Sequence, residues 1–170
     1  MGIEYLVGDA TRPTGDGAKI IVHICNDIGK WGRGFVLAVS RRWAEPERAY
    51  KASFKTGAPP RLGDVQFVSV ERDVTVANVI GQHGIASRPG GTPPVRYEAI
   101  RQGLEAVAER AVGARASVHM PRIGCGLAGG EWAVVEQIVH STLAKAGVVV
   151  FVYDLPAWSA RLPPPYPKRG

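Results

Sequence analysis

A glycine-rich segment late in the chain carries the residue types best suited to binding phosphate. Residues 121–132 read Pro-Arg-Ile-Gly-Cys-Gly-Leu-Ala-Gly-Gly-Glu-Trp, and four of the seven positions from 124 to 130 are glycine. Glycine lets main-chain N–H groups approach an oxygen closely, and the N-terminus of a following helix adds partial positive charge. We therefore expect a ligand that carries phosphate groups. A glycine turn that only joins a strand to a helix is the structural alternative.

This segment matches neither of the common nucleotide-binding motifs. No Gly-Lys-Ser/Thr follows it, so it is not a Walker A loop. The spacing G-x-G-x-x-G is met by Gly124, Gly126 and Gly129. It occurs late in the chain, however, and lacks the acidic residue about 20 positions further on that a dinucleotide-binding fold uses.

A second glycine-rich loop lies in the first third of the chain. Residues 26–35 read Asn-Asp-Ile-Gly-Lys-Trp-Gly-Arg-Gly-Phe. They follow the apolar run 19–25, which is typical of a strand buried on both faces of an α/β sheet. In such sheets ligands bind at the carboxyl ends of the strands. Two loops of this kind at one edge would hold a phosphate ligand from two sides.

Other reactive side chains have structural explanations. His23 lies inside the apolar run, where a hydrogen-bonded core histidine is favoured over a catalytic one. Cys125 lies in the later glycine loop, but no His/Asp pair is evident beside it, so packing is favoured over a nucleophilic role. Cys25 and Cys125 form neither a disulfide framework nor a metal-ligand spacing, which favours a cytoplasmic protein. We expect no metal and no cofactor.

Strands and helices alternate along the chain. Strands are predicted at residues 3–7, 19–25, 64–70, 74–80, 116–120 and 148–153. One helical region is predicted from residue 35 that continues to residue 54, and further helices are predicted at 95–111 and 134–143. This pattern predicts a three-layer α/β/α domain with a mixed, mostly parallel sheet of about six strands and one hairpin at 64–80. The domain is expected to span 1–158, followed by a Pro-rich tail at 159–170.

The composition is that of an ordinary globular domain. The 170 residues are 45% apolar and 21% charged, with a formal net charge of +6. The basic residues are dispersed, so a solvated basic face is favoured over nucleic-acid contact. No apolar run approaches the roughly 18 residues that a membrane span needs, and the first residues do not resemble a signal peptide. We expect a monomer that does not contact a membrane.

Together these segments resemble a macrodomain. The resemblance covers roughly residues 3–156 in the right order. It rests on Gly8-Asp9, on His23-Ile24-Cys25-Asn26, on the first glycine loop, and on the run Pro-Arg-Ile-Gly-Cys-Gly-Leu ahead of Trp132. The chain is similar to the branch that includes terminal ADP-ribose protein glycohydrolase, its catalytically silent relatives in chromatin remodellers, and fungal ADP-ribose-1″-phosphate phosphatase.

The resemblance implies an ADP-ribose pocket. Asp9, with Ala10 beside it, would accept a hydrogen bond from the adenine amino group; a turn residue is the structural alternative for Asp9. The diphosphate would be held by backbone amides of Gly32, Arg33, Gly34, Phe35, Ile123, Gly124, Cys125, Gly126, Leu127, Ala128, Gly129 and Gly130. Tyr153 and Leu155 would lie near the adenine and the proximal ribose. The distal ribose would be surrounded by Asn26, Trp31 and the segment 81–83.

The chain departs from the glycohydrolase of this branch at both catalytic positions. That enzyme uses a lysine after the fourth strand and an aspartate directly after the Gly-Cys-Gly-Leu run. Here Gln82 or His83 replaces the lysine and Ala128 replaces the aspartate. A lysyl covalent intermediate and that carboxylate base are therefore absent. Another hydrolase branch uses an Asn and an Asp around its first glycine loop. Asn26 could match the Asn, and Asp27 lies close to it.

Three functions stay open at this point. The leading one is a hydrolase that removes ADP-ribose from acidic side chains, whose labile ester needs little help from an acid. Its catalytic candidates are Asn26, Gln82 and His83, which would orient a water molecule. The second is a non-catalytic ADP-ribose reader. The third is an ADP-ribose-1″-phosphate phosphatase with His23 or His83 as acid and base. Outside the family, the same loops would suit a nucleotide- or nucleic-acid-binding α/β domain.

Overall fold

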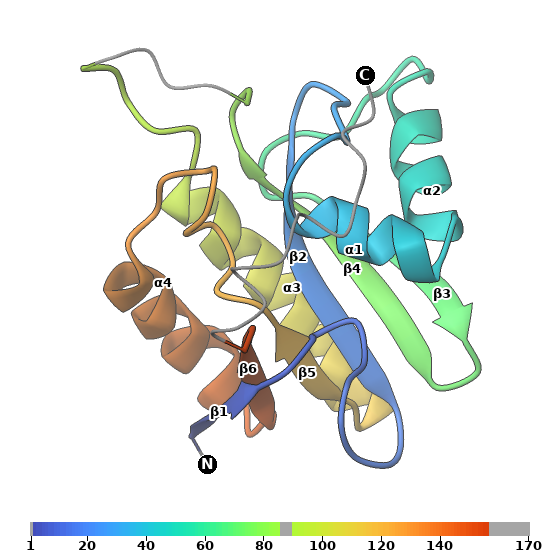
Figure 1. The fold of residues 1–170 in the computed structure, drawn as a ribbon, viewed down its shortest axis with the longest axis vertical. Coiled ribbons are helices and arrows are strands. Elements are labelled where there is room, and N and C mark those ends of the chain that lie inside the picture. The colour runs from blue at the N-terminus through green and yellow to red at the C-terminus, as the bar shows by residue number, and fades with distance from the viewer. Residues whose placement is uncertain (1, 86–89, 157–170) are drawn as a thin grey trace.

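The computed structural model describes residues 2–85 and 90–156, which form one six-stranded sheet between two layers of helices (Figure 1). The strands are β1 (Ile3–Val7), β2 (Lys19–Asn26), β3 (Val65–Glu71), β4 (Val74–Gln82), β5 (Ser117–Met120) and β6 (Val150–Asp154). The helices are α1 (Phe35–Arg42), α2 (Glu45–Ser53), α3 (Tyr97–Ala114) and α4 (Trp132–Val139), and α4 continues into the π-helical turn η1 (His140–Ala144).

The sheet is mixed, as the alternation of strands and helices predicts. Its strand order is β1-β6-β5-β2-β4-β3. All neighbours are parallel except β3, which pairs antiparallel with β4 and forms the predicted hairpin. The carboxyl ends of the five parallel strands therefore meet at one edge of the sheet, and the loops that leave this edge lie close together.

Two apolar clusters, one on each face of the sheet, form the core. Because successive side chains of a strand point to opposite faces, Ile20 and Val22 of β2 pack towards α3 and α4, whereas Ile21 packs towards α1 and α2. Leu104 anchors the first cluster and Tyr50 the second, and each is almost fully buried. The continuous apolar run of β2 thus reflects burial on both faces.

Several element boundaries differ from the sequence-based prediction. The helix predicted to begin at residue 95 begins at Tyr97, because Val95 and Arg96 donate their amides to Ala128 O and Gly81 O and stay extended. β2 and β4 each extend beyond the predicted end, to Asn26 and Gln82, which pair with each other in the sheet. Two predicted site residues therefore end neighbouring strands.

No helix within residues 2–85 and 90–156 is both long and apolar enough to span a bilayer. The predicted tail at 159–170 lies outside the described residues.

Candidate functional site

The two glycine-rich loops meet at the carboxyl edge of the sheet. Loop one, residues 27–34, joins β2 to α1, and loop two, residues 121–131, joins β5 to α4. Because β2 and β5 are parallel neighbours, both loops leave the same edge. A Cβ atom added to Gly34 would lie 3.7 Å from Leu127 Cδ1, so the loops approach to van der Waals distance. The fold therefore brings the two segments together.

Both loops present backbone amides that the fold does not use. Within the described part of the chain, the amides of residues 32–34 and of residues 126–128 have no hydrogen-bond acceptor. Neither α1 nor α4 has a side-chain N-cap or an acidic residue in its first turn. Six open donors and two uncapped helix N-termini favour an anionic ligand with several oxygens.

Loop two keeps its shape through its own backbone. The amide of Gly130 donates to Gly124 O at 2.8 Å, and the amide of Gly129 donates to Gly126 O at 3.1 Å. A Cβ atom on Gly130 would lie 2.4 Å from Gly124 O, which no side chain tolerates. A Cβ atom on Gly126, in contrast, would meet nothing within 4 Å. The fold requires Gly130 but not Gly126, so the missing side chain at Gly126 leaves space in front of the loop.

An arginine clamp anchors the start of loop two. Arg122 pairs with both carboxylate oxygens of Asp154 at the end of β6, at 2.7 and 2.8 Å. Its guanidinium lies 5.2 Å from the ring centre of Tyr5 and 5.4 Å from that of Trp132. The Arg122 guanidinium lowers the pKa of the Asp154 carboxyl. Sequence reasoning missed this clamp because no local spacing links residues that are 32 positions apart.

Asp9 forms the turn that was its structural alternative, and it keeps one oxygen available. Its Oδ1 accepts hydrogen bonds from the amide and the hydroxyl of Thr11, at 2.8 and 2.7 Å. Its Oδ2 accepts none from the described residues. The neighbouring Ala10 is buried. The turn therefore fixes the carboxylate without consuming it, which leaves Oδ2 free to accept from a ligand.

Tyr153 contacts the segment that follows Asp9. It is buried, its hydroxyl accepts the amide of Thr14 at 3.0 Å, and it lies 2.8 Å from His119 Nδ1. Leu155, two residues on, is 67% exposed. Of the two residues predicted near the adenine, only Leu155 has its side chain at the surface; Tyr153 acts by holding the Thr14 segment in place.

The Asn26 amide is engaged inside loop one. Its Nδ2 donates to Lys30 O at 2.6 Å, and its Oδ1 accepts the amides of Ile28 and Lys30 at 3.1 and 3.0 Å. The Tyr50 hydroxyl lies 2.7 Å from the same oxygen. Asn26 is buried. In this arrangement the side chain shapes loop one, and it does not project towards solvent.

The Trp31 side chain also points into the protein. It is 5% exposed, and its indole N–H donates to Ser40 Oγ at 2.7 Å. Its ring packs edge-on against His23 and tilted against Tyr50, with centroids 5.4 and 5.3 Å apart. Only the backbone of Trp31 is thus in a position to face a ligand, and the large apolar ring explains why it belongs to the core.

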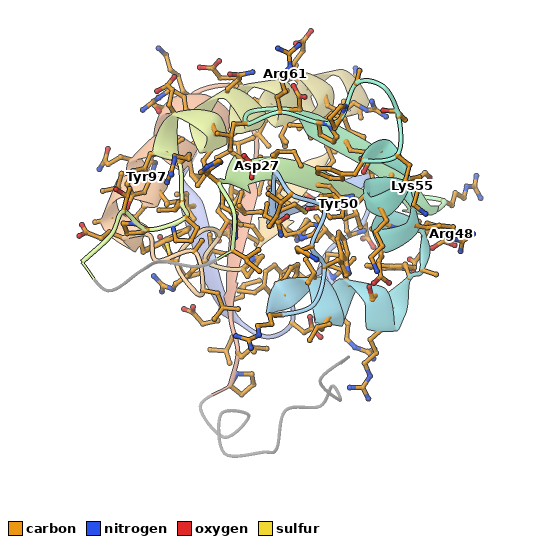
Figure 2. All side chains as sticks on the ribbon, turned by 90° about the horizontal axis from the view of Figure 1, so that it is seen from above. Asp27, Arg48, Tyr50, Lys55, Arg61 and Tyr97 are labelled. Atoms are coloured by element: carbon orange, nitrogen blue, oxygen red, sulfur yellow. The ribbon has the colours of Figure 1, made fainter. Side chains whose placement is uncertain are left out.

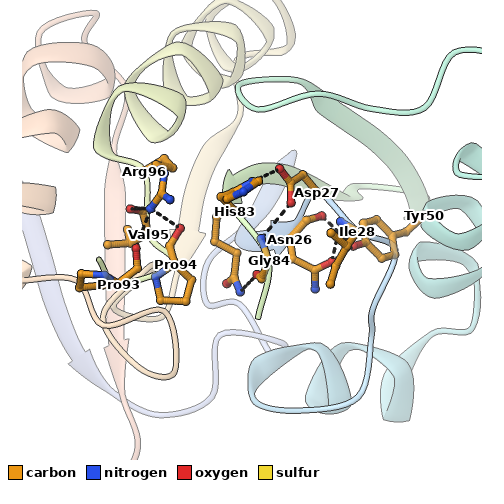
Figure 3. A network of polar contacts seen from close by, with 11 residues as sticks. Asn26, Asp27, Ile28, Tyr50, His83, Gly84, Pro93, Pro94, Val95 and Arg96 are labelled. Carbon is orange, nitrogen blue, oxygen red and sulfur yellow. Dashed lines mark hydrogen bonds and ion pairs between the residues drawn. The ribbon is translucent and has the colours of Figure 1, made fainter. Parts of the chain in front are cut away.

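Gln82, His83 and Asp27 form a polar cluster around Gly84 at the start of loop one. Figure 3 shows Asp27, His83 and Gly84 of this cluster. Gln82 Nε2 donates to Gly84 O at 2.9 Å, and Asp27 Oδ2 lies 2.7 Å from His83 Nδ1. Burial opposes the charge of Asp27, but the Gly84 amide and the His83 ring together hold the pKa of this carboxyl below its ordinary value. The sequence indicated that Asp27 lies near the site, but its contact with His83 could not be predicted because the two residues are 56 positions apart.

His23 is a core histidine, as its place in the apolar run predicts. It is 1% exposed, its Nε2 lies 2.5 Å from Asn78 Oδ1, and burial lowers its pKa to about 4. Cys125 donates its thiol to Ile123 O, and burial raises the pKa of that thiol. Within residues 2–85 and 90–156 no group of three or more His, Cys, Asp or Glu side chains could hold a metal ion.

The chain is similar in sequence and in fold to known proteins. A solved macrodomain protein from Streptomyces coelicolor is 53% identical, covers 89% of this chain and is covered over 98% of its own length, with a TM-score of 0.78. A protein of unknown function from Bacteroides thetaiotaomicron is 55% identical, with 91% and 99% of the two chains covered and a TM-score of 0.89. No protein-family model matches the chain.

More distant matches include longer proteins. Mouse chromodomain-helicase-DNA-binding protein 1-like is 33% identical over an alignment 168 positions long, which covers 94% of this chain but only 18% of that protein. The chain therefore spans less than a fifth of that relative. A structure of Thermosipho africanus DarTG in complex with ADP-ribose shares the fold at 19% identity and a TM-score of 0.64, with 85% of this chain and 39% of that chain covered.

Proposed function

We propose a function for this chain from one premise: it belongs to the macrodomain family. We infer that it binds ADP-ribose and hydrolyses the bond between ADP-ribose and acidic side chains of modified proteins. We assign it further to the branch that contains terminal ADP-ribose protein glycohydrolase. The run from Pro121 to Leu127 and the downstream Trp132 support that branch.

The observation that carries ADP-ribose binding is the set of open amides on two touching loops. A diphosphate offers several anionic oxygens, and the two touching loops carry six N–H donors that have no acceptor among the described residues. Each charge-assisted hydrogen bond contributes about 1.5–3 kcal/mol, and no buried counter-charge is needed. The ADP-ribose complex of DarTG, which has the same fold, supports this choice of ligand.

The remaining parts of the ligand are assigned around this grip. The adenine amino group would donate to Asp9 Oδ2, beside Ala10, with Leu155 at the surface next to it. The distal ribose would lie towards Gln82 and His83, which end β4 at the same edge. Asn26 contributes by fixing loop one, because its amide is already bonded there.

Hydrolysis would proceed by positioning and not by a covalent intermediate. No lysine occupies the end of β4, and Ala128 is 5% exposed and has no carboxylate. An ester at the anomeric carbon has a good leaving group, so an oriented water molecule is sufficient for attack. Both cysteines are free thiols, which supports a reducing compartment, the cytoplasm, as the location.

One observation favours a non-catalytic reader as the second candidate. The two residues that the related glycohydrolase uses for catalysis are replaced, whereas both glycine loops are kept. Binding without turnover is the behaviour that such a replacement produces.

The test combines calorimetry with a turnover assay. The hydrolase account predicts micromolar binding of ADP-ribose and release of free ADP-ribose from a protein carrying it on glutamate. Binding without release above the buffer rate would identify a reader. Phosphate release from ADP-ribose-1″-phosphate without action on the modified protein would identify a phosphatase. A folded sample that binds no ADP-ribose would overturn the proposal.

A further inference from the structure

Asp27 and His83 form a fixed pair at the ends of two neighbouring parallel strands. Asp27 Oδ2 lies 2.7 Å from His83 Nδ1, and Asp27 Oδ1 accepts the amide of Gly84 at 2.9 Å (Figure 3). The backbone amide of Asp27 also donates to Gln82 O at 3.1 Å. Both oxygens of the carboxylate are thus engaged, and the two backbones are held together. An ordinary surface ion pair lacks this support.

The pair begins loop one and is linked to loop two through the segment before α3. Asp27 is the first residue of loop one. The amide of His83 donates to Pro94 O at 2.8 Å, and the next residue, Val95, donates to Ala128 O of loop two at 3.0 Å. A short chain of hydrogen bonds therefore connects loop one, the pair and loop two.

The contact also fixes which ring nitrogen carries the proton. An ionised carboxylate only accepts hydrogen bonds, so the neutral imidazole must keep its proton on Nδ1. The lone pair then resides on Nε2. The His83 side chain is 61% exposed and that of Asp27 only 16%. The ring therefore presents Nε2 outward, and the carboxylate stays behind it.

The Asp27 carboxylate of loop one is the charged group in contact with the imidazole among the described residues. The guanidinium of Arg96, in the segment before α3, donates to the carbonyls of Pro93, Pro94 and Val95. The pKa of the Asp27 carboxyl is held below its ordinary value, so Asp27 is ionised at neutral pH.

We propose that His83 is the general base of the hydrolysis and that Asp27 is its positioning residue. This inference rests on the function proposed above. A water oxygen bonds to the anomeric carbon while the carbon–oxygen bond to the acceptor carboxylate breaks, and that carboxylate leaves with the electron pair. The water proton passes to His83 Nε2 and then to solvent. The products are ADP-ribose, a free carboxylate and one proton.

The experiment measures kcat against pH for four proteins: wild type, His83→Gln, Asp27→Asn and the control His140→Gln, whose histidine is exposed on η1. A histidine base works only when neutral, so wild-type kcat falls on acidification. His83→Gln is expected to lower kcat by roughly 100-fold or more and to remove the acidic limb of the profile. The kcat of Asp27→Asn is expected to lie between that of the wild type and that of His83→Gln. ADP-ribose affinity should stay within about twofold throughout, because the loss of a group that acts only in the transition state lowers kcat and leaves ligand binding unaltered.

A second measurement does not depend on the variants. Nitrogen-15 spectra of the wild-type imidazoles at neutral pH should show His83 with its proton on Nδ1. A proton on Nε2 would overturn the pair. If the wild type turns over substrate and His83→Gln has the same rate and pH profile, the role of His83 as general base is overturned, whereas the proposed hydrolase activity stands. Binding of ADP-ribose with no turnover in wild type would overturn the hydrolase and the pair together.

Discussion

At the scale of single residues, the glycines of loop two have different tasks. Gly130 is required by the fold, because any Cβ atom would collide with Gly124 O. Gly126 has open space in front of it and an ordinary backbone conformation. Its lack of a side chain therefore serves access to the loop amides and not the stability of the protein.

Replacing Gly126 with valine separates these two tasks. We expect Gly126→Val to weaken ADP-ribose binding by roughly 100-fold or more, because two lost charge-assisted hydrogen bonds already cost about 3 kcal/mol. The free energy of unfolding should change by no more than about 0.5 kcal/mol. Calorimetry and urea denaturation measure the two quantities. Gly57→Val is the matched control, since a Cβ atom there also meets nothing within 4 Å; equal affinities for the two variants would contradict the assignment.

The residue types at the site could be predicted from the sequence, but their contacts could not. Glycine spacing identified both loops, and the place of His23 in an apolar run identified a core histidine. The pairing of Asp27 with His83 depends on the register of β2 against β4, which no local pattern encodes. Trp31 was expected at the ligand, but its ring fills the core between His23 and Tyr50.

At the scale of elements, loop two depends on a contact with the end of β6. Arg122 holds Asp154 and lies over two aromatic rings, so the loop leaves β5 in a fixed direction. The Tyr5 hydroxyl, in turn, contacts Glu136 of α4 and accepts the indole N–H of Trp132. The strand, the loop and the helix are thereby linked at one corner of the sheet.

Removing this clamp is expected to affect binding more than stability. Arg122→Gln should lower ADP-ribose affinity on the order of tenfold, because about 1.4 kcal/mol of loop ordering is shifted to the binding step. Exposed ion pairs stabilise folding by only about 0–1 kcal/mol, so thermal unfolding should change little. Arg110→Gln is the control, since it removes a similar stacking contact with Phe67. A loss of stability in Arg122→Gln without a loss of affinity would contradict this role.

The order of strands and helices could be predicted from hydrophobic periodicity. A strand buried on two faces has a continuous apolar run, and an amphipathic helix has an apolar stripe. The residues at which the elements begin and end could not be predicted in this way. The extended segment before α3 is set by hydrogen bonds from Val95 and Arg96 to Ala128 and Gly81. These partners belong to other elements, so the first turn of the predicted helix is replaced by tertiary contacts.

At the scale of the whole molecule, the formal net charge of +6 includes four basic residues, Arg88, Arg161, Lys168 and Arg169, that lie outside the described residues. Viewed onto the edge of the sheet, Arg48, Lys55 and Arg61 point outward while Tyr50 points into the protein (Figure 2). Some of the basic residues have acidic partners, as in Arg42 with Glu71 and Lys51 with Glu47. This distribution fits the predicted solvated basic face.

Acid sensitivity of the whole fold is expected from its two buried histidines, His23 and His119. Burial lowers the pKa of each from 6.5 to about 4, so the unfolded chain binds more protons between these values. Stability is therefore retained above pH 6.5 and falls as the pH drops through this window, by up to about 1.4 kcal/mol per pH unit for each histidine. Urea denaturation between pH 6.5 and 5, above the range where carboxylates titrate, measures this slope.

The variant His23→Gln removes one of the two groups and should reduce the slope by about half, because His119 remains, whatever its effect on stability at neutral pH. His140→Gln, at an exposed position, should leave the slope as in wild type. An equally steep slope in His23→Gln would assign the acid sensitivity to other groups.

The central claim is that open amides of two separate loops grip one diphosphate. Amide-resolved NMR during titration with ADP-ribose tests it most directly. The account predicts large downfield shifts for the amides of residues 32–34 and 126–128. A control titration with AMP, which lacks the diphosphate, should produce the shifts near Asp9 but not the full set that ADP-ribose produces. ADP-ribose binding that leaves both groups of amides unshifted would contradict the account.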